Sequence, residues 1–307
     1  MAMPEEFHQL ARAVNNWGRW GDDDELGTLN LVTADSVRRG ASLVKKGKAF
    51  SLALPLGPDG PQIGLIPGRI NPLRTMLAIN QATFDPEGFC TSDDVVVMGL
   101  QAGTHWDSLA HATYLNRLYN GHPIESINEA GASKCGIGNV TKLVSRGVLL
   151  DVAAALGVER LDVPYAITGD DLDAACELAK VTVAAGDIVL IRTGMMQLFK
   201  AGDKQGYYGG TGPSFWSVQW FRDHDVAAVA TDNITFEYLD FDKHPELLLP
   251  VHLLHLVEMG MTQGQNFDLE ELAADCADDG VYEFLLEASP EPFVNGLGSP
   301  VNPIAIK

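Results

Sequence analysis

Residues 101–111 read QAGTHWDSLAH, and they place His105, Asp107 and His111 within one short segment. On an extended segment, residues i and i+2 point to the same side. His105 and Asp107 can therefore offer one imidazole nitrogen and one carboxylate oxygen to a single ion, at distances of about 2.0–2.2 Å. Histidines in such segments are also typical of a packed core, where each makes a single hydrogen bond. The spacing alone leaves both interpretations open.

A third ligand has to come from a distant part of the chain. His252 and His255 lie in PVHLLHLVEMG (250–260), where nearly all other residues are apolar. Residues i and i+3 share one face of a helix, so both imidazoles can point in the same direction. Pro250 is typical of a first helical position, which puts His252 near the helix start, where a ligand can project into a cleft. A core role remains the alternative for both histidines.

Strand-like and helix-like segments alternate along much of the chain. Apolar runs predict strands at 49–56, 93–107, 147–153, 186–194, 226–233 and 281–290. Amphipathic spacing and capping residues predict helices at 4–14, 33–47, 166–179, 213–225, 250–260 and 267–280. The run at 93–107 is expected to be a buried strand that leads into the motif. This order is typical of an α/β protein with a mixed sheet and flanking helices.

We expect a single domain over residues 1–307, because no internal repeat or low-complexity linker divides the chain. Within it, residues 1–48 form an N-terminal helical segment. Residues 57–74 are rich in Gly and Pro and are expected to form a long surface loop. Loops of that length in compact domains often serve as lids or subunit contacts.

The composition excludes several classes of protein. Hydrophobic residues make up 46% of the chain and charged residues 20%, as in ordinary soluble globular proteins. The formal net charge of −20 and the absence of a basic patch argue against binding to nucleic acid or to an anionic membrane. No run approaches the roughly 18 apolar residues of a membrane helix, and the N-terminus lacks the apolar core of a signal peptide. The four cysteines form no CxxC pair, which is typical of reduced thiols in a cytoplasmic protein.

The stretch AGTHWDSLAH (102–111) resembles the HxGTHxDxPxH signature of the cyclase family of metal-dependent hydrolases, which includes bacterial kynurenine formamidases and isatin hydrolase. The residues that match are Gly103, Thr104, His105, Asp107 and His111. Gln101 replaces the first His of the signature, and Leu109 replaces its Pro. Other segments follow the order seen in the family, namely RWGDDDELGTLNLVT, RGVLLDV, GDIVLIRTG, TDN, PVHLL and GQNFDLEELA. The resemblance implies the swivelling β/β/α fold.

In this family, histidines and an aspartate of the motif, a downstream histidine and a late glutamate surround one or two divalent ions. The resemblance implies His105, Asp107 and His252 as metal ligands, with Gln101 assisting. Gln265 stands where the late glutamate is expected. A glutamine carbonyl can bind a hard cation, but it carries no charge and transfers no proton. We therefore expect one divalent cation, Mn²⁺ or Zn²⁺, rather than two.

Three carboxylates lie nearest in sequence to these positions and could compensate for the missing glutamate, namely Asp232, Glu237 and Glu258. For Glu258, a solvated helix face is the simpler interpretation.

The implied reaction is hydrolysis of a cyclic amide, a lactone or an arylformamide-like substrate by metal-activated water. His111 is implied as the acid/base residue, because an ordinary pKa near 6.5 lets it accept and return a proton. Gln265 takes the place of a proton-transferring glutamate and is expected to orient the substrate. Trp106, between two implied ligands, and Asn233, at the end of a predicted strand, are the candidate substrate contacts.

Two other functions stay open. Because Gln265 is neutral, the same fold could carry a cyclase, dehydratase or isomerase reaction that needs no hydrolytic water. Loss of the family ligands could instead leave a metal-free protein that binds a small molecule. In each case we expect a homodimer or homotetramer that acts on a small molecule and contacts neither nucleic acid nor membrane.

Overall fold

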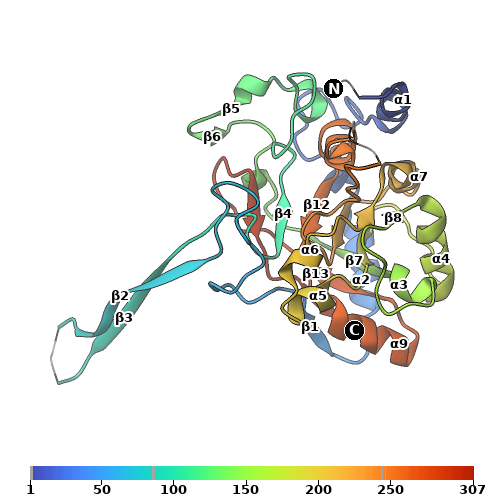
Figure 1. Cartoon of the computed structure of the whole chain (residues 1–307). Helices are drawn as coiled ribbons and strands as arrows, with labels where there is room; N and C mark the ends of the chain where they lie inside the picture. The colour runs from blue at the N-terminus through green and yellow to red at the C-terminus, as the bar shows by residue number, and fades with distance from the viewer. Residues whose placement is uncertain (1–2, 85–86, 244, 246) are drawn as a thin grey trace.

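A computed structural model describes residues 3–84, 87–243, 245 and 247–307. Within these residues, nine strands form one mixed sheet (Figure 1). They are β1 (Ala49–Ser51), β4 (His105–Asp107), β7 (Val144–Asp151), β9 (Ile188–Arg192), β11 (Ala228–Thr231), β12 (Thr262–Gln265), β13 (Glu283–Glu287), β14 (Gly298–Pro300) and β15 (Ile304–Ile306). Their order in the sheet is β1-β15-β13-β7-β9-β11-β12-β4-β14.

The centre of the sheet is parallel and its two edges are antiparallel. β7, β9, β11 and β12 run parallel, while β13, β15 and β1 on one side and β4 and β14 on the other pair antiparallel. Every residue of β9 and β11 is buried, as expected for parallel strands covered on both faces. Alternation along β9 sends Val189 and Ile191 into one core and Ile188 and Leu190 into the other.

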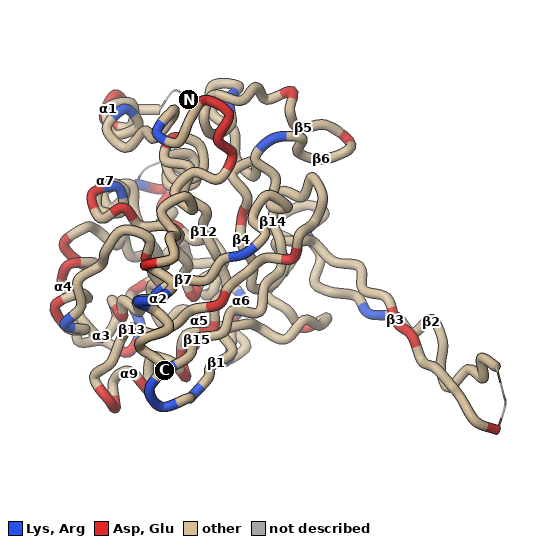
Figure 2. Tube along the Cα trace, turned by 180° about the vertical axis from the view of Figure 1, so that it is seen from behind, with Lys and Arg blue, Asp and Glu red and all other residues tan. Residues whose placement is uncertain are grey.

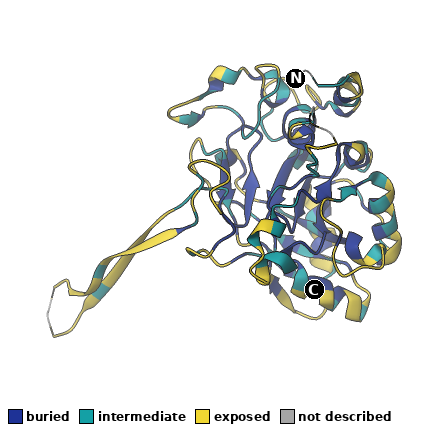
Figure 3. Cartoon of the chain, viewed as in Figure 1, coloured by how far each residue is buried: buried dark blue, intermediate teal, exposed yellow. Residues whose placement is uncertain are grey.

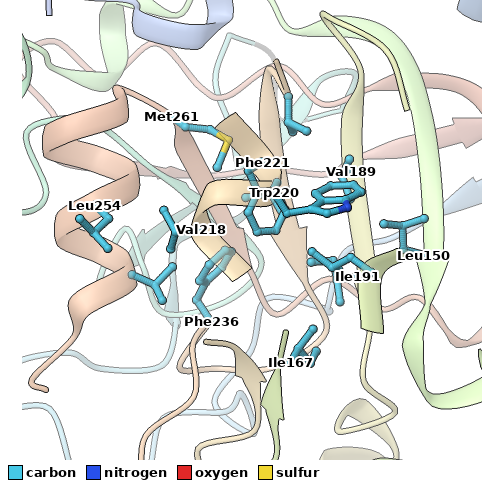
Figure 4. Packing of buried hydrophobic residues seen from close by; sticks show 14 of the residues in the cluster. Leu150, Ile167, Val189, Ile191, Val218, Trp220, Phe221, Phe236, Leu254 and Met261 are labelled. Carbon is cyan, nitrogen blue, oxygen red and sulfur yellow. The ribbon is translucent and has the colours of Figure 1, made fainter. Parts of the chain in front are cut away.

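The first face of the sheet is covered by a layer of helices. Phe7 and Val14 belong to this core, as do Trp220 and Phe236. Figure 4 shows aromatic side chains of the layer, including Trp220 and Phe236, between Leu254 and the strand residue Ile191. The helices are α1 (Glu5–Val14), α3 (Val152–Ala155), α4 (Gly169–Ala179), α7 (Val218–Asp223) and the continuous pair α8 (Pro250–His252) and η6 (Leu253–Met259).

The second face is covered mainly by α9 (Glu270–Asp279), whose Leu272 and Cys276 pack against strand residues such as Leu149 and Phe284. Helix α2 (Ala34–Ser42) lies against β7 and β13. A glycine is required in α2, because a Cβ at Gly40 would lie 3.0 Å from the backbone nitrogen of Arg146.

Short elements complete the chain. The remaining helices are α5 (Met196–Lys200) and α6 (Lys204–Tyr207), with the 3₁₀ turns η1 (Gly27–Leu31), η2 (Tyr119–Gly121), η3 (Ile124–Ser126), η4 (Ile137–Asn139) and η5 (Phe215–Ser217). Two small ladders join β5 (Ile127–Asn128) to β6 (Gly131–Ala132) and β8 (Ala166–Ile167) to β10 (Gly212–Pro213).

Strands β2 (Leu73–Ala82) and β3 (Cys90–Val97) form a hairpin, here called the arm, that projects far from the body (Figure 1). Figure 3 shows the arm as exposed along nearly its whole length, in contrast to the buried central strands. Leu73 pairs with Val97 and Thr75 with Val95, so these residues share one face of the ribbon. The arm therefore presents an apolar face that nothing in this chain covers among the described residues.

The arm overturns one expectation. The segment 93–107 was expected to be a single buried strand, but β3 ends at Val97 and only His105–Asp107 enters the main sheet. Val95, Val96 and Val97 are all exposed. Their β-branched side chains favour a strand, but they pair with β2 outside the body, so hydrophobicity alone gave the wrong location.

Most other predicted elements are confirmed with shorter boundaries. The helix expected at 33–47 is α2, which has the predicted Thr33 cap, in a capping box with Ser36, but ends at Ser42. The capping box of Thr168 and Asp171 starts α4 as predicted. The strand at 281–290 is β13, but β14 and β15 follow it in sequence. The mixed α/β sheet with flanking helices is thereby confirmed.

No helix among the described residues is both long enough and apolar enough to span a membrane. Figure 2 shows acidic residues distributed over α4, α7 and α9 rather than gathered in one patch. The net charge of −20 is therefore spread across the surface.

Candidate active site

The candidate site is built on β4, whose alternation separates the motif into two sides. His105 and Asp107 point to the face covered by α8 and η6, and both side chains are fully buried. Trp106 points to the opposite face, where its ring packs edge-on against Phe267 at 5.2 Å and its Nε1 donates to Ala288 O. The turn before β4 is fixed by Thr104, whose hydroxyl donates to the backbone carbonyl of Asn266 at 2.6 Å.

The downstream histidines face this side of β4 from the helix that α8 and η6 form. Pro250 occupies its first position, and η6 is π-helical, a geometry often found at functional sites. His252 faces Gln265 of β12, with 3.4 Å between the two side-chain Nε2 atoms. His255 lies one turn further on, where it packs edge-on against Phe221 at 5.1 Å and Phe236 at 5.6 Å. Burial lowers the pKa of His255 to about 3, so it is a neutral core residue.

His105 is held in one tautomer. Its Nδ1 lies 2.8 Å from the backbone carbonyl of Gly103, which can only accept, so the neutral ring carries its proton on Nδ1. The Nε2 lone pair is therefore directed at Asp107 Oδ1, at a distance of 3.6 Å. Both this Nε2 and Asp107 Oδ1 are buried without a hydrogen-bond partner among the described residues.

His252 is held in the same way by Glu237. The fully buried carboxylate of Glu237 accepts from Val251 N at 2.8 Å, from His252 N at 2.9 Å and, in a short contact, from His252 Nδ1. Burial alone would lower the pKa of His252, but Glu237 and Asp107 together hold the pKa above its ordinary value. In its neutral form, His252 presents the lone pair of Nε2 to the Gln265 amide at 3.4 Å, with Asp107 Oδ2 at 4.0 Å.

His111 completes the group from the solvent side. Its Nε2 lies 3.8 Å from Asp107 Oδ1, and its side chain is 24% exposed where His105 and Asp107 are fully buried. Asp107 raises the pKa of His111, but burial and the nearby charges of His252 and Arg69 outweigh it, so the pKa lies below its ordinary value. His111 is thus the member of the group that a substrate can reach.

Gln265 bridges the two sides of the site. It pairs with His105 in the β12–β4 ladder, and its Nε2 donates to Asp107 Oδ2 at 2.9 Å. Burial would raise the pKa of Asp107, but His111, His105 and His252 together hold the pKa well below its usual range. The centre is therefore an ionised carboxylate surrounded by three imidazoles and an amide.

The donor atoms fit a divalent cation in kind. A neutral imidazole lone pair beside an ionised carboxylate gains an attractive contact when a proton or a cation lies between the two groups. Nitrogen and oxygen donors of this type suit Zn²⁺ or Mn²⁺. Across residues 3–84, 87–243, 245 and 247–307, however, no group of three or more His, Cys, Asp or Glu is already arranged to hold a metal ion. The separations of 3.6–4.0 Å exceed the roughly 3.4 Å expected between tetrahedral ligands of one ion.

The structure does not bring three of the predicted residues into this group. Trp106 lies on the other face of the sheet, because neighbouring residues of a strand alternate, and this corrects its expected contact with substrate. Asn233 is buried and its amide donates to Thr211 O at 2.6 Å and to Phe236 O at 3.3 Å, so it supports the turn after β11 rather than facing the site.

The Gln101 amide lies beside Gly298 of β14. A Cβ added at Gly298 would lie 2.6 Å from Gln101 Nε2. Gly298 is the partner of Asp107 in β14, so Gln101 is one strand away from the aspartate.

Comparison with known proteins places this arrangement in a family. The model of the Cyclase family matches residues 50–238. A crystal structure of a novel cyclase is 37% identical, with a TM-score of 0.89, and the match covers 97% of this chain and 99% of the other. The chain belongs to the cyclase family.

Other solved structures with the same fold are more distant in sequence. Isatin hydrolase A from Ralstonia solanacearum is 19% identical, with a TM-score of 0.64 over 89% of this chain and 95% of its own. A predicted metal-dependent hydrolase from Bacillus stearothermophilus is 16% identical, with a TM-score of 0.51 over 84% of this chain and 97% of its own. Both share the fold of this cyclase-family chain. No curated protein matches its sequence significantly.

Two residues at the site escaped assignment from the sequence. Glu237 was one of three carboxylates considered, and its contact with His252 spans 15 positions that no spacing rule connects. Arg69 lies in the Gly/Pro-rich loop, and its charge reaches Asp107. The sequence signal for Arg69 was only its place in a long loop before the motif.

Proposed function

We propose that this cyclase-family chain is a metal-dependent hydrolase of a cyclic amide, a lactone or an arylformamide-like substrate. The observation that carries the proposal is the pair of buried, unpartnered atoms His105 Nε2 and Asp107 Oδ1, with His252 Nε2 4.0 Å from the same carboxylate. A cation between these atoms would satisfy all three of them. The fold shared with isatin hydrolases and with a predicted metal-dependent hydrolase agrees with this function.

The residues divide the work by position. His105, Asp107 and His252 would hold one divalent cation, Mn²⁺ or Zn²⁺. A bound ion supplies Lewis acidity, which polarises a carbonyl and makes water more acidic. His111 takes the proton from the attacking water and returns it to the leaving group, because it is the exposed imidazole of the group. Gln265 fixes the Asp107 carboxylate through its amide and orients the substrate.

The neutral Gln265 also favours a second candidate. A cyclase, dehydratase or isomerase on the same fold would not need a second carboxylate to move protons for a hydrolytic water. Reaction in ¹⁸O-labelled water distinguishes the two, because hydrolysis places the label in the product and isomerisation does not.

The test is a combined binding and turnover experiment. Protein purified without chelators is analysed for metals, dialysed against EDTA, and titrated with Mn²⁺ and Zn²⁺ by calorimetry. A panel of lactones, cyclic amides and arylformamides is then assayed with each form. We expect one tight divalent site per chain and metal-dependent turnover. Absence of divalent binding, or equal ligand affinity in wild type and His105→Ala, would instead support a metal-free binding protein.

A further inference from the structure

The loop between β1 and β2 brings an arginine to the candidate site. Arg69 packs so closely on the segment leading to the motif that a Cβ at Gly99 would lie 3.2 Å from its Cγ. The backbone around it is tied down, since Gly99 N donates to Ile70 O at 3.3 Å and Arg69 N to Ile66 O at 3.2 Å. Arg69 is therefore held beside residues 99–102 rather than free in solvent.

Further contacts fix this loop against the body. Gln62 is buried, and its amide donates to Ala102 O at 3.0 Å. Asn71 reaches back across the loop, where its amide donates to Gln62 O at 2.9 Å. From the other side, the Tyr208 hydroxyl donates to Gln62 Oε1 at 3.3 Å. The loop is thus an ordered support for the arginine and not a loose lid.

The guanidinium of Arg69 makes no hydrogen bond or ion pair within the part of the chain that the structure describes, although it is only partly exposed. The other deeply placed arginines differ: Arg192 contacts Asp151 and Glu270, and Arg146 contacts Asp187 and Glu283. A partly buried cation without a hydrogen-bonded counter-charge is costly, so arginines in such places usually have an anion to bind.

The charge of Arg69 acts on the candidate site. Burial lowers the pKa of Arg69, and the nearby charge of Asp107 only partly opposes this. Arg69 therefore lies within electrostatic reach of the Asp107 carboxylate, and His111 lies 3.8 Å from the same carboxylate.

We propose that Arg69 is a specificity residue that binds a carboxylate group of the substrate beside His111. The planar guanidinium offers paired donors that match a carboxylate, and a chain with net charge −20 would otherwise repel an anionic substrate. The substrate class is thereby narrowed to amides or lactones that carry a carboxylate away from the scissile bond. This inference rests on the proposed function for the chemistry, but the binding it predicts is measurable without turnover.

The first test is direct binding. Calorimetry compares carboxylates with their primary amides (benzoate with benzamide, phenylacetate with phenylacetamide, succinate with succinamide) on metal-loaded and EDTA-dialysed protein. We expect at least one carboxylate to bind more tightly than its amide in both forms. Arg69→Gln should weaken that carboxylate about 10- to 100-fold and change the amide less than about 2-fold. If no carboxylate binds wild-type protein, or if Arg69→Gln affects both members of a pair equally, the proposal is overturned.

Matched variants separate recognition from folding. Arg74→Gln removes an exposed arginine of the arm and should leave carboxylate binding unchanged. Arg69→Lys keeps the charge but loses the paired donors, so it should bind carboxylate with intermediate affinity. Thermal unfolding and circular dichroism should match wild type for all three variants. Weaker carboxylate binding with Arg69→Gln that Arg69→Lys does not partly restore would point to local misfolding and would count against the proposal.

Turnover provides the second test and keeps the two proposals apart. With a lactone that carries a carboxylate and its neutral methyl ester, Arg69→Gln should raise KM for the anionic substrate only. Equal losses in kcat for both would place Arg69 on the reaction's developing oxyanion and reject carboxylate recognition. If no substrate is hydrolysed but Arg69-dependent carboxylate binding remains, the hydrolase function fails while this inference stands.

Discussion

At the scale of single residues, the site depends on side chains that fix the histidines. His105 and His252 each donate Nδ1–H to an acceptor, so both Nε2 atoms remain available at Asp107. Outer partners of this kind set the tautomer and orientation of a ligand and strongly affect metal affinity. Glu237 is the charged member of this set, and it is fully buried.

Replacing Glu237 tests this role. Glu237→Gln keeps the shape but removes the charge that holds His252, so we expect divalent affinity to fall about 10- to 100-fold. The measurement is calorimetric titration with Mn²⁺ or Zn²⁺. Glu258→Gln is the matched control, because Glu258 lies on the same helix but contacts Asn15 and not His252. Unchanged affinity in Glu237→Gln would show that His252 needs no such partner to bind the ion.

A carboxylate at residue 265 should lower the stability of the metal-free protein but strengthen the binding of Mn²⁺. In Gln265→Glu, a second carboxylate lies next to Asp107 Oδ2, now 2.9 Å from the amide. Without metal, we expect the two charges to lower the stability by roughly 2–4 kcal/mol. With Mn²⁺ the loss should disappear, since the extra charge strengthens cation binding. Thermal unfolding in EDTA and in Mn²⁺ measures both effects.

Gln263→Glu is the control for that experiment. Gln263 is also fully buried on β12, but it lies two residues before Gln265 and beside His255. Its variant should lose stability equally with and without Mn²⁺. A similar recovery with Mn²⁺ in both variants would contradict the assignment of Gln265 to the site.

The sequence predicted those members of the candidate site that are close together along the chain and lie on the same face of one strand. Strand alternation puts His105 and Asp107 on one side of the strand, whereas the resemblance to the family singled out His252 as their partner. The resemblance to the family added His111 and Gln265. Glu237 and Arg69 could not be assigned, because their contacts depend on how a loop and a turn pack in three dimensions. Trp106 was expected near the substrate because it lies between His105 and Asp107 in the sequence. On a strand, however, neighbouring residues point to opposite faces, so its ring faces away from both.

At the scale of elements, one glycine controls how the histidine-bearing helix ends. Gly260 follows η6 with a φ of +66°, and a Cβ there would lie 2.3 Å from the Tyr119 ring. The chain then reverses into β12, which carries Gln265. The left-handed conformation and the close aromatic contact together require a residue without a side chain.

Gly260→Ala should therefore be more disruptive than a helix-end glycine usually is. We expect a loss of roughly 2–4 kcal/mol in the free energy of unfolding, from backbone strain plus overpacking. Gly280→Ala is the matched control, because Gly280 ends α9 with a φ of +70° but has nothing within 4 Å of an added Cβ. It should lose only about 1 kcal/mol. Urea unfolding of both variants gives the comparison, and equal losses would show that Tyr119 simply moves aside.

The arm shows where element prediction from sequence has its limit. The valines at 95–97 are about as apolar as the residues at 188–191 of β9, and local preference favours a strand for both segments. Whether such a strand joins the core or projects from it depends on the connection before it and on what covers its faces. The turns at 98–104 that separate β3 from β4 carry no strong breaker beyond Gly99 and Gly103.

At the scale of the whole molecule, the main open question is what covers the apolar face of the arm, because no described residue of this chain packs on it. Isolated two-stranded ribbons are marginally stable in water, and exposed apolar patches usually mark contacts. We propose that this face packs against a second copy of the chain, in keeping with the homodimer or homotetramer expected from the family resemblance.

Light scattering after size-exclusion chromatography tests this self-association. Wild-type protein should run as a dimer or tetramer, and Val95→Glu combined with Val97→Glu should shift it to monomer. Val96→Glu is the control, since Val96 pairs with Arg74 on the opposite face of the ribbon. A monomeric wild type, or the same shift in the control, would reject this role for the arm.

The position of β4 between β12 and β14 also affects folding during synthesis, because both neighbours of β4 are made much later. Asp107 and Thr262, whose hydroxyl donates to the Asp107 carbonyl, are 155 positions apart. At 5–20 residues per second, a ribosome needs roughly ten to thirty seconds to supply β12 after β4 has been made. During that interval the motif is an unpaired edge with an ionised aspartate and no Gln265 or His252. We therefore expect stalled nascent chains that end before β12 to bind no divalent ion and to depend on chaperones for their solubility.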